Sequence, residues 1–149
     1  MVEKKKDANK AKVAREISKI WGGLESDQIA TLKEHVEITK YKKGEMIYQC
    51  DEIPTDAMCL LTGKVKIFKD GINGKSQIIR VIKPNEFFGF RAYFANEIYK
   101  TAAQALDTCT VVHFPFPVLM KLLQKSYKIG YYFIKYLSVE IGKSDDRTV

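Results

Sequence analysis

The sequence predicts one mainly β domain, a sandwich or a barrel, with helices at both ends. Seven short segments rich in Val, Ile, Leu, Phe, Tyr and Thr follow one another between residues 37 and 114, and turn signals separate them. The longer helical patterns lie before and after this stretch. At 149 residues the chain is long enough for one hydrophobic core and too short for two.

Residues 1–19 are expected to form a basic tail followed by a helix. Seven basic residues stand here against three acidic ones, so this segment carries a net charge of +4 out of +7 for the chain. We interpret residues 1–12 as a solvated, mobile terminus rather than as a DNA contact. The apolar pattern of a helix begins at Val13 and ends at Gly22-Gly23. The basic residues are Lys4, Lys5, Lys6, Lys10, Lys12, Arg15 and Lys19.

A second helix is predicted from Gln28 to His35. Ser26 and Asp27 precede it, and both are residue types that cap the N-terminus of a helix. Ile29, Leu32 and Val36 would then lie on one face. This face is expected to cover the first edge of the β domain.

The predicted strands begin at Glu37. The clearest alternation is at Lys64–Lys69, where Val65 and Ile67 alternate with lysines, as in a strand with one apolar and one polar face. Residues 70–74 contain Asp, Asn and two Gly and are expected to form a hairpin turn. The seven predicted strands are Glu37–Tyr41, Met46–Gln49, Ala57–Thr62, Lys64–Lys69, Gln77–Ile82, Ala102–Leu106 and Cys109–Phe114.

Residues 85–103 have the order of groups that an anion-binding loop needs. Gly89 lets a ligand approach the backbone, a short helix at residues 92–95 offers free N–H groups, and Lys100 supplies a positive charge. The loop is therefore the first candidate for a binding site.

Two helices are predicted at the C-terminal end. The first runs from Pro115 to Lys125 and has Pro117 in its first turn, where a missing N–H costs nothing. The second, Lys128–Gly142, carries two adjacent apolar stripes, whereas a helix that rests on a barrel needs one. This favours self-association with a second copy, and a deeply buried terminal helix is the alternative. The stripes contain Ile129, Tyr132, Phe133, Tyr136, Leu137, Val139 and Ile141.

Composition argues against several classes of protein. No apolar run approaches the roughly 18–20 residues that span a membrane, so we expect a cytoplasmic protein without a membrane partner. Cys50, Cys59 and Cys109 are widely spaced and are expected to be buried, reduced thiols. The sequence shows no metal-ligand cluster, nucleophile triad or carboxylate pair, so we expect neither a metal site nor an enzyme.

Four motifs in a fixed order identify a family resemblance. Lys43-Gly44 precedes Ile47-Tyr48, Thr62–Ile67 follows, and Phe87–Gly89 stands ahead of Lys100–Ala102. Together they resemble the cyclic-nucleotide-binding domain and, more narrowly, the N-terminal sensor half of Crp/Fnr-family transcription regulators. The resemblance covers residues 20–142.

The resemblance implies an eight-stranded β-roll, a double-stranded β-helix or jelly roll, over residues 20–127, with a ligand pocket inside it. It also implies a homodimer through a C-terminal helix, with residues 128–149 forming that helix and a hinge near Arg147. In such regulators a helix-turn-helix domain follows and binds DNA. That domain is absent from this sequence, so the chain is expected to be a sensor fragment that reaches DNA only through it.

Two alternatives to a regulator remain open from the sequence. One is a stand-alone protein that binds a cyclic nucleotide or another small ligand. The other is a structural dimerisation domain with a vestigial pocket. Both share the expected fold, so they differ from a sensor only in whether a ligand and a DNA-binding domain exist.

The resemblance assigns the ligand pocket to six residues of the loop, and their identities predict a diverged site. In nucleotide-binding members a Glu after the Gly accepts a hydrogen bond from the ribose; Phe90 stands there, and an unpaired ribose hydroxyl would cost about 1–3 kcal/mol. Lys100 stands where an Arg makes two parallel hydrogen bonds to the phosphate, and a lysine keeps the positive charge without this bidentate geometry. The six residues are Phe88, Gly89, Phe90, Arg91, Lys100 and Thr101.

Two features of the loop leave its ligand open. Arg91 could turn inward to meet an anion, or it could start the short helix and point to solvent. Aromatic side chains could line a site for an apolar or acidic molecule, and filling of the cavity by these side chains is favoured. We therefore expect no usual binding of cyclic AMP and keep a cyclic nucleotide or another small anion as the candidate ligand. The aromatic residues are Phe88, Phe90, Tyr93, Phe94 and Tyr99.

Two other sensing chemistries of the family find little support. An iron–sulfur sensor needs cysteines near the N-terminus, and residues 1–49 contain none. A haem sensor needs an axial ligand, and the candidates are His35 and His113. His113 lies in a predicted strand, where a histidine is more often a hydrogen-bonded core or edge residue.

Overall fold

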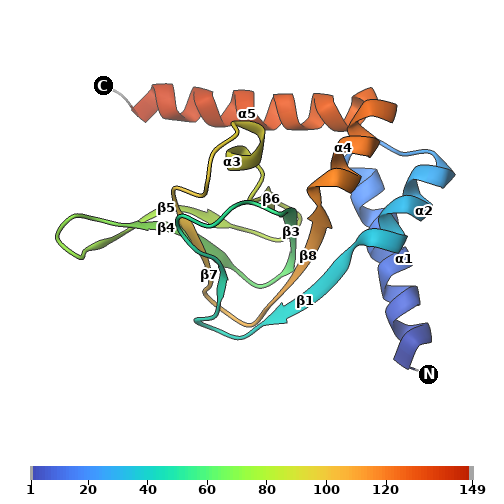
Figure 1. The fold of residues 1–149 in the computed structure, drawn as a ribbon, viewed down its shortest axis with the longest axis horizontal. Helices are drawn as coiled ribbons and strands as arrows, with labels where there is room; N and C mark the ends of the chain where they lie inside the picture. The colour runs from blue at the N-terminus through green and yellow to red at the C-terminus, as the bar shows by residue number, and fades with distance from the viewer. Residues whose placement is uncertain (1, 148–149) are drawn as a thin grey trace. The chain divides into compact units, whose positions relative to one another are not determined.

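The computed structural model describes residues 2–147, with side chains for residues 9–146 (Figure 1). The chain divides into two compact units. Residues 35–116 form one unit, which holds all the strands of the described residues. Met1–Glu34 and Pro117–Val149 form the other, which is helical.

The strands form two antiparallel sheets of four, in the orders β1-β8-β3-β6 and β2-β7-β4-β5. This confirms the predicted mainly β fold and the eight strands that the resemblance implies. The β4–β5 hairpin, which turns at residues 71–75, extends away from the rest of the roll (Figure 1). The strands are β1 (Glu37–Tyr41), β2 (Met46–Tyr48), β3 (Asp56–Thr62), β4 (Val65–Asp70), β5 (Ser76–Ile82), β6 (Phe87–Phe88), β7 (Ala102–Ala105) and β8 (Cys109–Pro115).

The inner faces of the two sheets share one apolar core. On β3 and β8, alternate residues such as Leu60 and Val111 point inward, and both are fully buried. Removing such side chains from water supplies the main driving force for folding, about 1.5–3 kcal/mol for each large one. The core comprises Tyr48, Met58, Leu60, Val65, Ile67, Ile82, Phe88, Ala92, Tyr99, Ala103, Ala105, Cys109 and Val111.

One strand lies inside the segment that the sequence assigned to a loop. β6 has two residues, Phe87 and Phe88, which pair with Cys59 and Met58 of β3. Both phenylalanines are fully buried. A strand of two residues has no alternation to detect, and its identity depends on the partner strand.

The helical unit begins earlier than predicted. Helix α1 runs over Val2–Ile20, so the expectation of a mobile tail at residues 1–12 is wrong for residues 2–12, while Met1 lies outside the described residues. Ala and Lys are strong helix formers, and they extend the helix N-terminal to its apolar pattern. The apolar part, Val13, Ile17 and Trp21, is buried, and Trp21 contacts Phe133 with ring centroids 6.2 Å apart.

Helix α2 (Ser26–His35) agrees with the prediction except at its cap. The Gln28 side chain accepts a hydrogen bond from the backbone N–H of Glu25 at 3.0 Å, which makes Glu25 the capping position. The capping role predicted for Ser26 and Asp27 is therefore wrong. The side chain of Leu32 is buried, as predicted for the apolar face.

The last two helices are α4 (Phe116–Lys125) and α5 (Tyr127–Arg147). The predicted end at Gly142 is wrong, because α5 continues through residues 143–147, where the hinge was expected. Lys143 pairs with Glu140 one turn earlier at 3.2 Å, which supports this polar extension. None of the described helices is both long and apolar enough to cross a membrane.

The turn between β3 and β4 gives a test of backbone geometry. Gly63 has φ +93, and a Cβ there would lie 2.6 Å from the Thr108 carbonyl oxygen. We predict that Gly63→Ala lowers the free energy of unfolding by about 2–5 kcal/mol, because it adds a clash to an unfavourable φ. Urea titration followed by circular dichroism measures the change.

Gly44→Ala is the matched control for this prediction. Gly44 has φ +91 but no heavy atom within 4 Å of a Cβ position, so only the conformational cost of about 1–2 kcal/mol is expected. Equal losses in the two variants would contradict the assigned role of the Thr108 carbonyl.

Candidate functional site

The cassette loop, defined as residues 89–101, connects β6 to β7 and contains the short helix α3 (Arg91–Phe94). Gly89 has φ +78, and a Cβ there would lie 2.7 Å from Met58 Cε. The Tyr99 hydroxyl donates a 2.9 Å hydrogen bond to the Gly89 carbonyl. The backbone at Gly89 is thus closely covered by the protein's own side chains.

Aromatic side chains surround the start of α3. Phe88 and Phe90 are buried at 0% and 3% exposure. Tyr93 stacks on Phe116 with ring centroids 3.8 Å apart, and Phe90 meets the edge of Phe94 at 6.4 Å. These rings pack against one another, and such contacts stabilise beyond the area they bury.

The far end of the loop is joined to β2 by two tyrosines. Tyr48 and Tyr99 stack with ring centroids 3.8 Å apart, and the Tyr48 hydroxyl is hydrogen-bonded to the Thr101 side chain. Burial raises the pKa of both phenols, so both hydroxyls stay protonated and act as neutral hydrogen-bonding groups. Thr101 is therefore fixed by the protein itself.

The two cations of the cassette loop share one carboxylate. Glu97 Oε2 lies 3.0 Å from Lys100 Nζ and 3.3 Å from an Arg91 guanidinium nitrogen. Hydrogen bonds from Lys100 and then from Arg91 hold the pKa of Glu97 below its ordinary value. Both basic side chains are more than half exposed, so these pairs contribute little to stability. Their importance is geometric, because an internal anion stands between the two cations.

This arrangement favours the second interpretation of Arg91, in which it starts the short helix and points to solvent. It is the first residue of α3, its side chain is 52% exposed, and its partner is Glu97. Sequence reasoning missed Glu97 as a residue of the site. Glu97 stands three residues before Lys100, a spacing at which opposite charges pair on helices, but residues 97–100 lie outside a helix, so the sequence holds no reliable signal for this pair.

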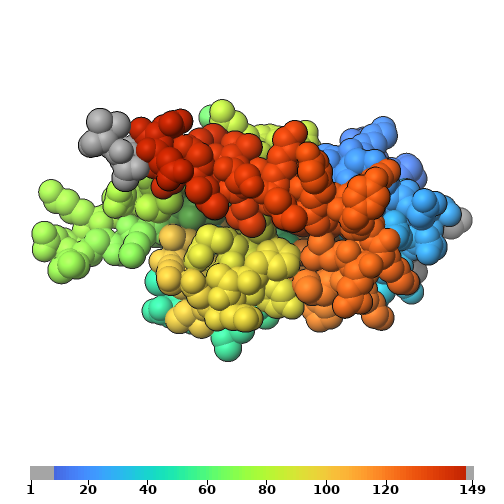
Figure 2. Space-filling model, turned by 90° about the horizontal axis from the view of Figure 1, so that it is seen from above, coloured from blue at the N-terminus to red at the C-terminus, as the bar shows by residue number. Residues whose placement is uncertain are grey.

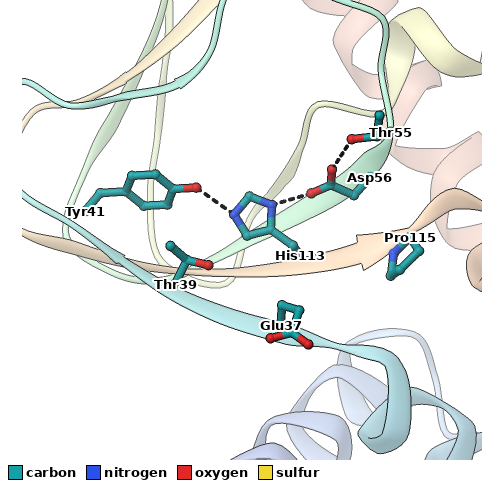
Figure 3. A pocket seen from close by; sticks show the side chains of 7 residues that line it. All are labelled: Glu37, Thr39, Tyr41, Thr55, Asp56, His113 and Pro115. Atoms are coloured by element: carbon teal, nitrogen blue, oxygen red, sulfur yellow. Dashed lines mark hydrogen bonds and ion pairs between the residues drawn. The ribbon is translucent and has the colours of Figure 1, made fainter.

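A second group of polar residues, of which sequence reasoning named only His113, lies on the sheet formed by β1, β8 and β3. The Tyr41 hydroxyl is 2.9 Å from His113 Nε2, and His113 Nδ1 is hydrogen-bonded to Asp56 Oδ2 (Figure 3). Thr55 donates a 2.5 Å hydrogen bond to the other oxygen of Asp56. This chain of four side chains borders a pocket of about 400 Å³, the inner-face pocket. Its lining residues are Glu37, Thr39, Tyr41, Thr55, Asp56, His113 and Pro115.

The strand register explains why these residues meet. Glu37 of β1 pairs with His113 of β8, and His113 also pairs with Met58 of β3, two residues from Asp56. Paired residues and their neighbours two positions away share one face of a sheet. The polar residues therefore lie on the same sheet face as Val111, which points into the core.

The local environment sets the ionisation of the hydrogen-bonded side chains in this group. Burial acts to raise the pKa of the Asp56 carboxyl, but hydrogen bonds from His113 and Thr55 and the charge of His113 outweigh it and hold this pKa below its ordinary value. Burial, and secondly the negative charge of Asp56, raises the pKa of Tyr41. At neutral pH this hydrogen-bonded group of side chains therefore contains an ionised carboxylate, Asp56, and a neutral phenol, Tyr41.

These contacts test the sequence predictions for histidine and cysteine. The prediction of a hydrogen-bonded His113 is confirmed, since both ring nitrogens have partners. Cys59 and Cys109 are buried and free as predicted, and burial raises the pKa of Cys59 to about 12. The prediction is wrong for Cys50, which is exposed in the turn after β2. Among the described residues no group of three His, Cys, Asp or Glu is placed to hold a metal ion.

Comparison with protein families gives one match of high coverage. The family described as "Cyclic nucleotide-binding domain" matches residues 38–126. This range contains all eight strands except the first residue of β1, and it includes the whole cassette loop.

Curated relatives and solved structures extend this comparison. The regulatory protein HlyX of Actinobacillus pleuropneumoniae is 28% identical over 127 residues, which are 85% of this chain and 52% of that protein. The chain spans about half the length of the curated relatives it matches.

Two solved structures show the same fold. The sensor domain of the transcriptional regulator DNR from Pseudomonas aeruginosa has a TM-score of 0.75 at 18% identity, and the match covers 91% of this chain and 95% of that chain. The catabolite activator protein of Thermus thermophilus has a TM-score of 0.74 at 15% identity, covering 85% and 59%.

The Asp56–His113 pair predicts a pH dependence of stability. Because its pKa is lowered on folding, Asp56 contributes stability that is complete above the unfolded value of about 3.9 and is lost as the pH falls through the folded value. We predict that Asp56→Asn lowers the free energy of unfolding at pH 7 by about 1–2 kcal/mol, a value discounted for partial exposure.

Urea titrations of both proteins between pH 3 and pH 8 measure this effect. The difference between wild type and Asp56→Asn should shrink below pH 4, whereas Asp70→Asn, an exposed control, should change stability by less than about 0.5 kcal/mol throughout. A difference that stays constant down to pH 3 would show that the carboxylate charge is not the source.

Proposed function

This chain belongs to the cyclic nucleotide-binding domain family, and on that premise we propose that it is the sensor and dimerisation domain of a Crp/Fnr-type transcription regulator. The relative HlyX is named as a regulatory protein, and an "Anaerobic regulatory protein" of Aggregatibacter actinomycetemcomitans is 28% identical over 108 residues, 72% of this chain and 41% of that protein. These relatives are regulators rather than enzymes, in agreement with the expectation from the sequence. In the proposed whole protein, DNA binding belongs to a helix-turn-helix domain outside this chain.

The observation that carries the sensor assignment is a β-roll followed by a long terminal helix. The DNR sensor domain matches this chain over almost the full length of both. A ligand that changes the packing of the roll would shift the position of the helix in such a protein, and that shift is the signal in the proposed mechanism.

We further propose that the cassette loop has diverged from cyclic nucleotide recognition. Phe90 is buried at the position where the resemblance places the ribose-binding Glu. Glu97 already pairs with both Arg91 and Lys100, so a phosphate must compete with this carboxylate for the two cations. Tyr99 and Met58 cover Gly89, which removes the open backbone that a phosphate would approach.

Dimerisation through α5 is the second part of the proposal. Ile129 and Phe133, expected at the interface, are buried at 0% and 4% within the chain. Tyr132, Tyr136 and Leu137 are half-buried, while Ile141 is exposed.

Four of the five exposed large apolar residues among the described side chains of α5 form a different stripe, which supports the dimer. Tyr127, Tyr131, Ile134 and Ile141 are 62–81% exposed and follow one another at intervals of four, three and seven residues. This is the spacing of positions that pair in a two-stranded coiled coil. Figure 2 shows the side chains of α5 in orange to red. A second copy of α5 is the partner that this spacing fits.

The nucleotide proposal predicts weak binding. Isothermal titration calorimetry of the chain with cyclic AMP and with cyclic GMP is expected to give dissociation constants of about 1 mM or weaker, because the ribose acceptor is missing and the cations are already paired. Glu97→Gln is expected to improve the affinity for either nucleotide several-fold, since it frees Lys100 and Arg91. Glu34→Gln, an exposed residue of α2, is the control and should change nothing. Micromolar binding by the wild type would overturn the divergence proposal.

The dimer proposal predicts a change in mass. Light scattering at about 50 μM is expected to give twice the chain mass of 17.1 kDa for the wild type and the single chain mass for Ile134→Glu, which places a charge in the apolar stripe. Lys135→Glu changes an adjacent exposed residue outside the stripe and should remain dimeric. A monomeric wild type, or a dimeric Ile134→Glu variant, would contradict the interface.

A further inference from the structure

The inner-face pocket is distinct from the cassette loop and is built on different strands. Its lining residues come from β1, from β8, and from β3 with the turn before it. His113 and Asp56 have side-chain exposures of 17% and 23%, so they are reachable from the pocket but largely removed from water. Their hydrogen-bonded chain holds the three strands in a fixed arrangement (Figure 3).

Two hydrogen bonds in this group of side chains have a defined direction. Asp56 is ionised at neutral pH and can only accept, so His113 Nδ1 carries the hydrogen of that bond. Thr55 donates to the second oxygen of Asp56. The Tyr41 hydroxyl is hydrogen-bonded to the other ring nitrogen of His113, Nε2.

Hydrogen-bond acceptors line most of the pocket. The Tyr41 oxygen and the oxygens of Asp56 keep lone pairs beyond those used in the chain, and the Glu37 carboxylate and Thr39 hydroxyl also line the cavity. Two of the described lining residues are carboxylates, and none is a lysine or an arginine. An anion would be repelled here, even though the whole chain carries a net charge of +7.

We propose that the inner-face pocket binds a small organic cation rich in N–H groups, an alkylammonium or guanidinium compound. Such a ligand donates hydrogen bonds to the carboxylate and hydroxyl oxygens that line the pocket. The Tyr41 and His113 rings form an aromatic wall with centroids 6.0 Å apart and a tilt of 44°, and an aromatic face attracts a cation. The volume of about 400 Å³ lies in the range of small-molecule sites.

This inference is independent of the proposed sensor function, since it uses none of the cassette residues. It adds a ligand of opposite charge to the one that the cassette loop would take. A cation in this pocket would contact β1, β8 and β3 together and so stabilise the folded roll.

The test uses putrescine and agmatine at pH 8 and low ionic strength, where an imidazole in water is neutral. The chain contains two histidines, and His35 on α2 serves as an internal reference in the NMR spectrum. We expect either amine to shift the His113 ring resonances in a saturable way, with a dissociation constant between about 0.1 and 5 mM, and to leave those of His35 unchanged. The matched ligand control is 1,4-butanediol, which has the length of putrescine without its charge and should cause no saturable shift.

Two variants complete the test. Asp56→Asn is expected to weaken amine binding at least tenfold, and Glu37→Gln, at the exposed rim, is expected to weaken it two- to fivefold without loss of fold. Glu34→Gln, in the helical unit, should bind as tightly as the wild type. If Asp56→Asn does not fold, Glu37→Gln and the ligand controls still decide the result. Equal shifts at both histidines, equal binding of the diol, or unchanged affinity in Glu37→Gln would overturn the proposal.

Discussion

Strand β8 is hydrogen-bonded on both edges and buried on both faces, and the rest of the β unit is arranged around it. It pairs with β1 over five residues and with β3 along its length. Val111 faces the inner core, while Phe114 on the opposite face stacks against Phe87 of β6 at 5.9 Å. A central strand that is apolar on both faces has one stable register, because a slip of one residue would move every side chain to the other face. The register of β8 then fixes His113 opposite Glu37 and beside Asp56.

The roll carries two polar regions of opposite character. In the cassette loop, basic side chains are exposed and paired with Glu97, so the protein supplies its own anion. In the inner-face pocket, a partly buried chain ends in an ionised Asp56 and leaves acceptors toward the cavity. An anion must compete with Glu97 at the first region, whereas a cation meets no lysine or arginine among the lining residues that the structure describes at the second. The two regions therefore differ in the charge of the ligand that each can take.

In helix α5, packing within the chain determines which apolar residues are buried and which stay exposed. Its sequence predicts two adjacent apolar stripes, whereas packing on a barrel needs one. The structure buries Ile129 and Phe133 within the chain and leaves Tyr131 and Ile134 exposed. The number of apolar residues predicts more apolar surface than one contact needs. The choice of the face that is left open depended on Trp21, a residue more than a hundred positions away that packs on Phe133.

The sequence by itself determined the elements with strong local patterns. All strands except β6, and helices α2 and α4, were predicted to within two residues at each end, because alternation, turn residues and proline are local signals. The motifs at Thr62–Ile67 and Phe87–Gly89 were also enough to identify the family. Only the tertiary structure decided β6, the pairing of Glu97 with two cations, and the Tyr41–His113–Asp56 chain. Each of these joins groups whose meeting depends on a strand register or a loop closure, and side-chain contacts over 57 and 72 positions leave no local trace in a sequence.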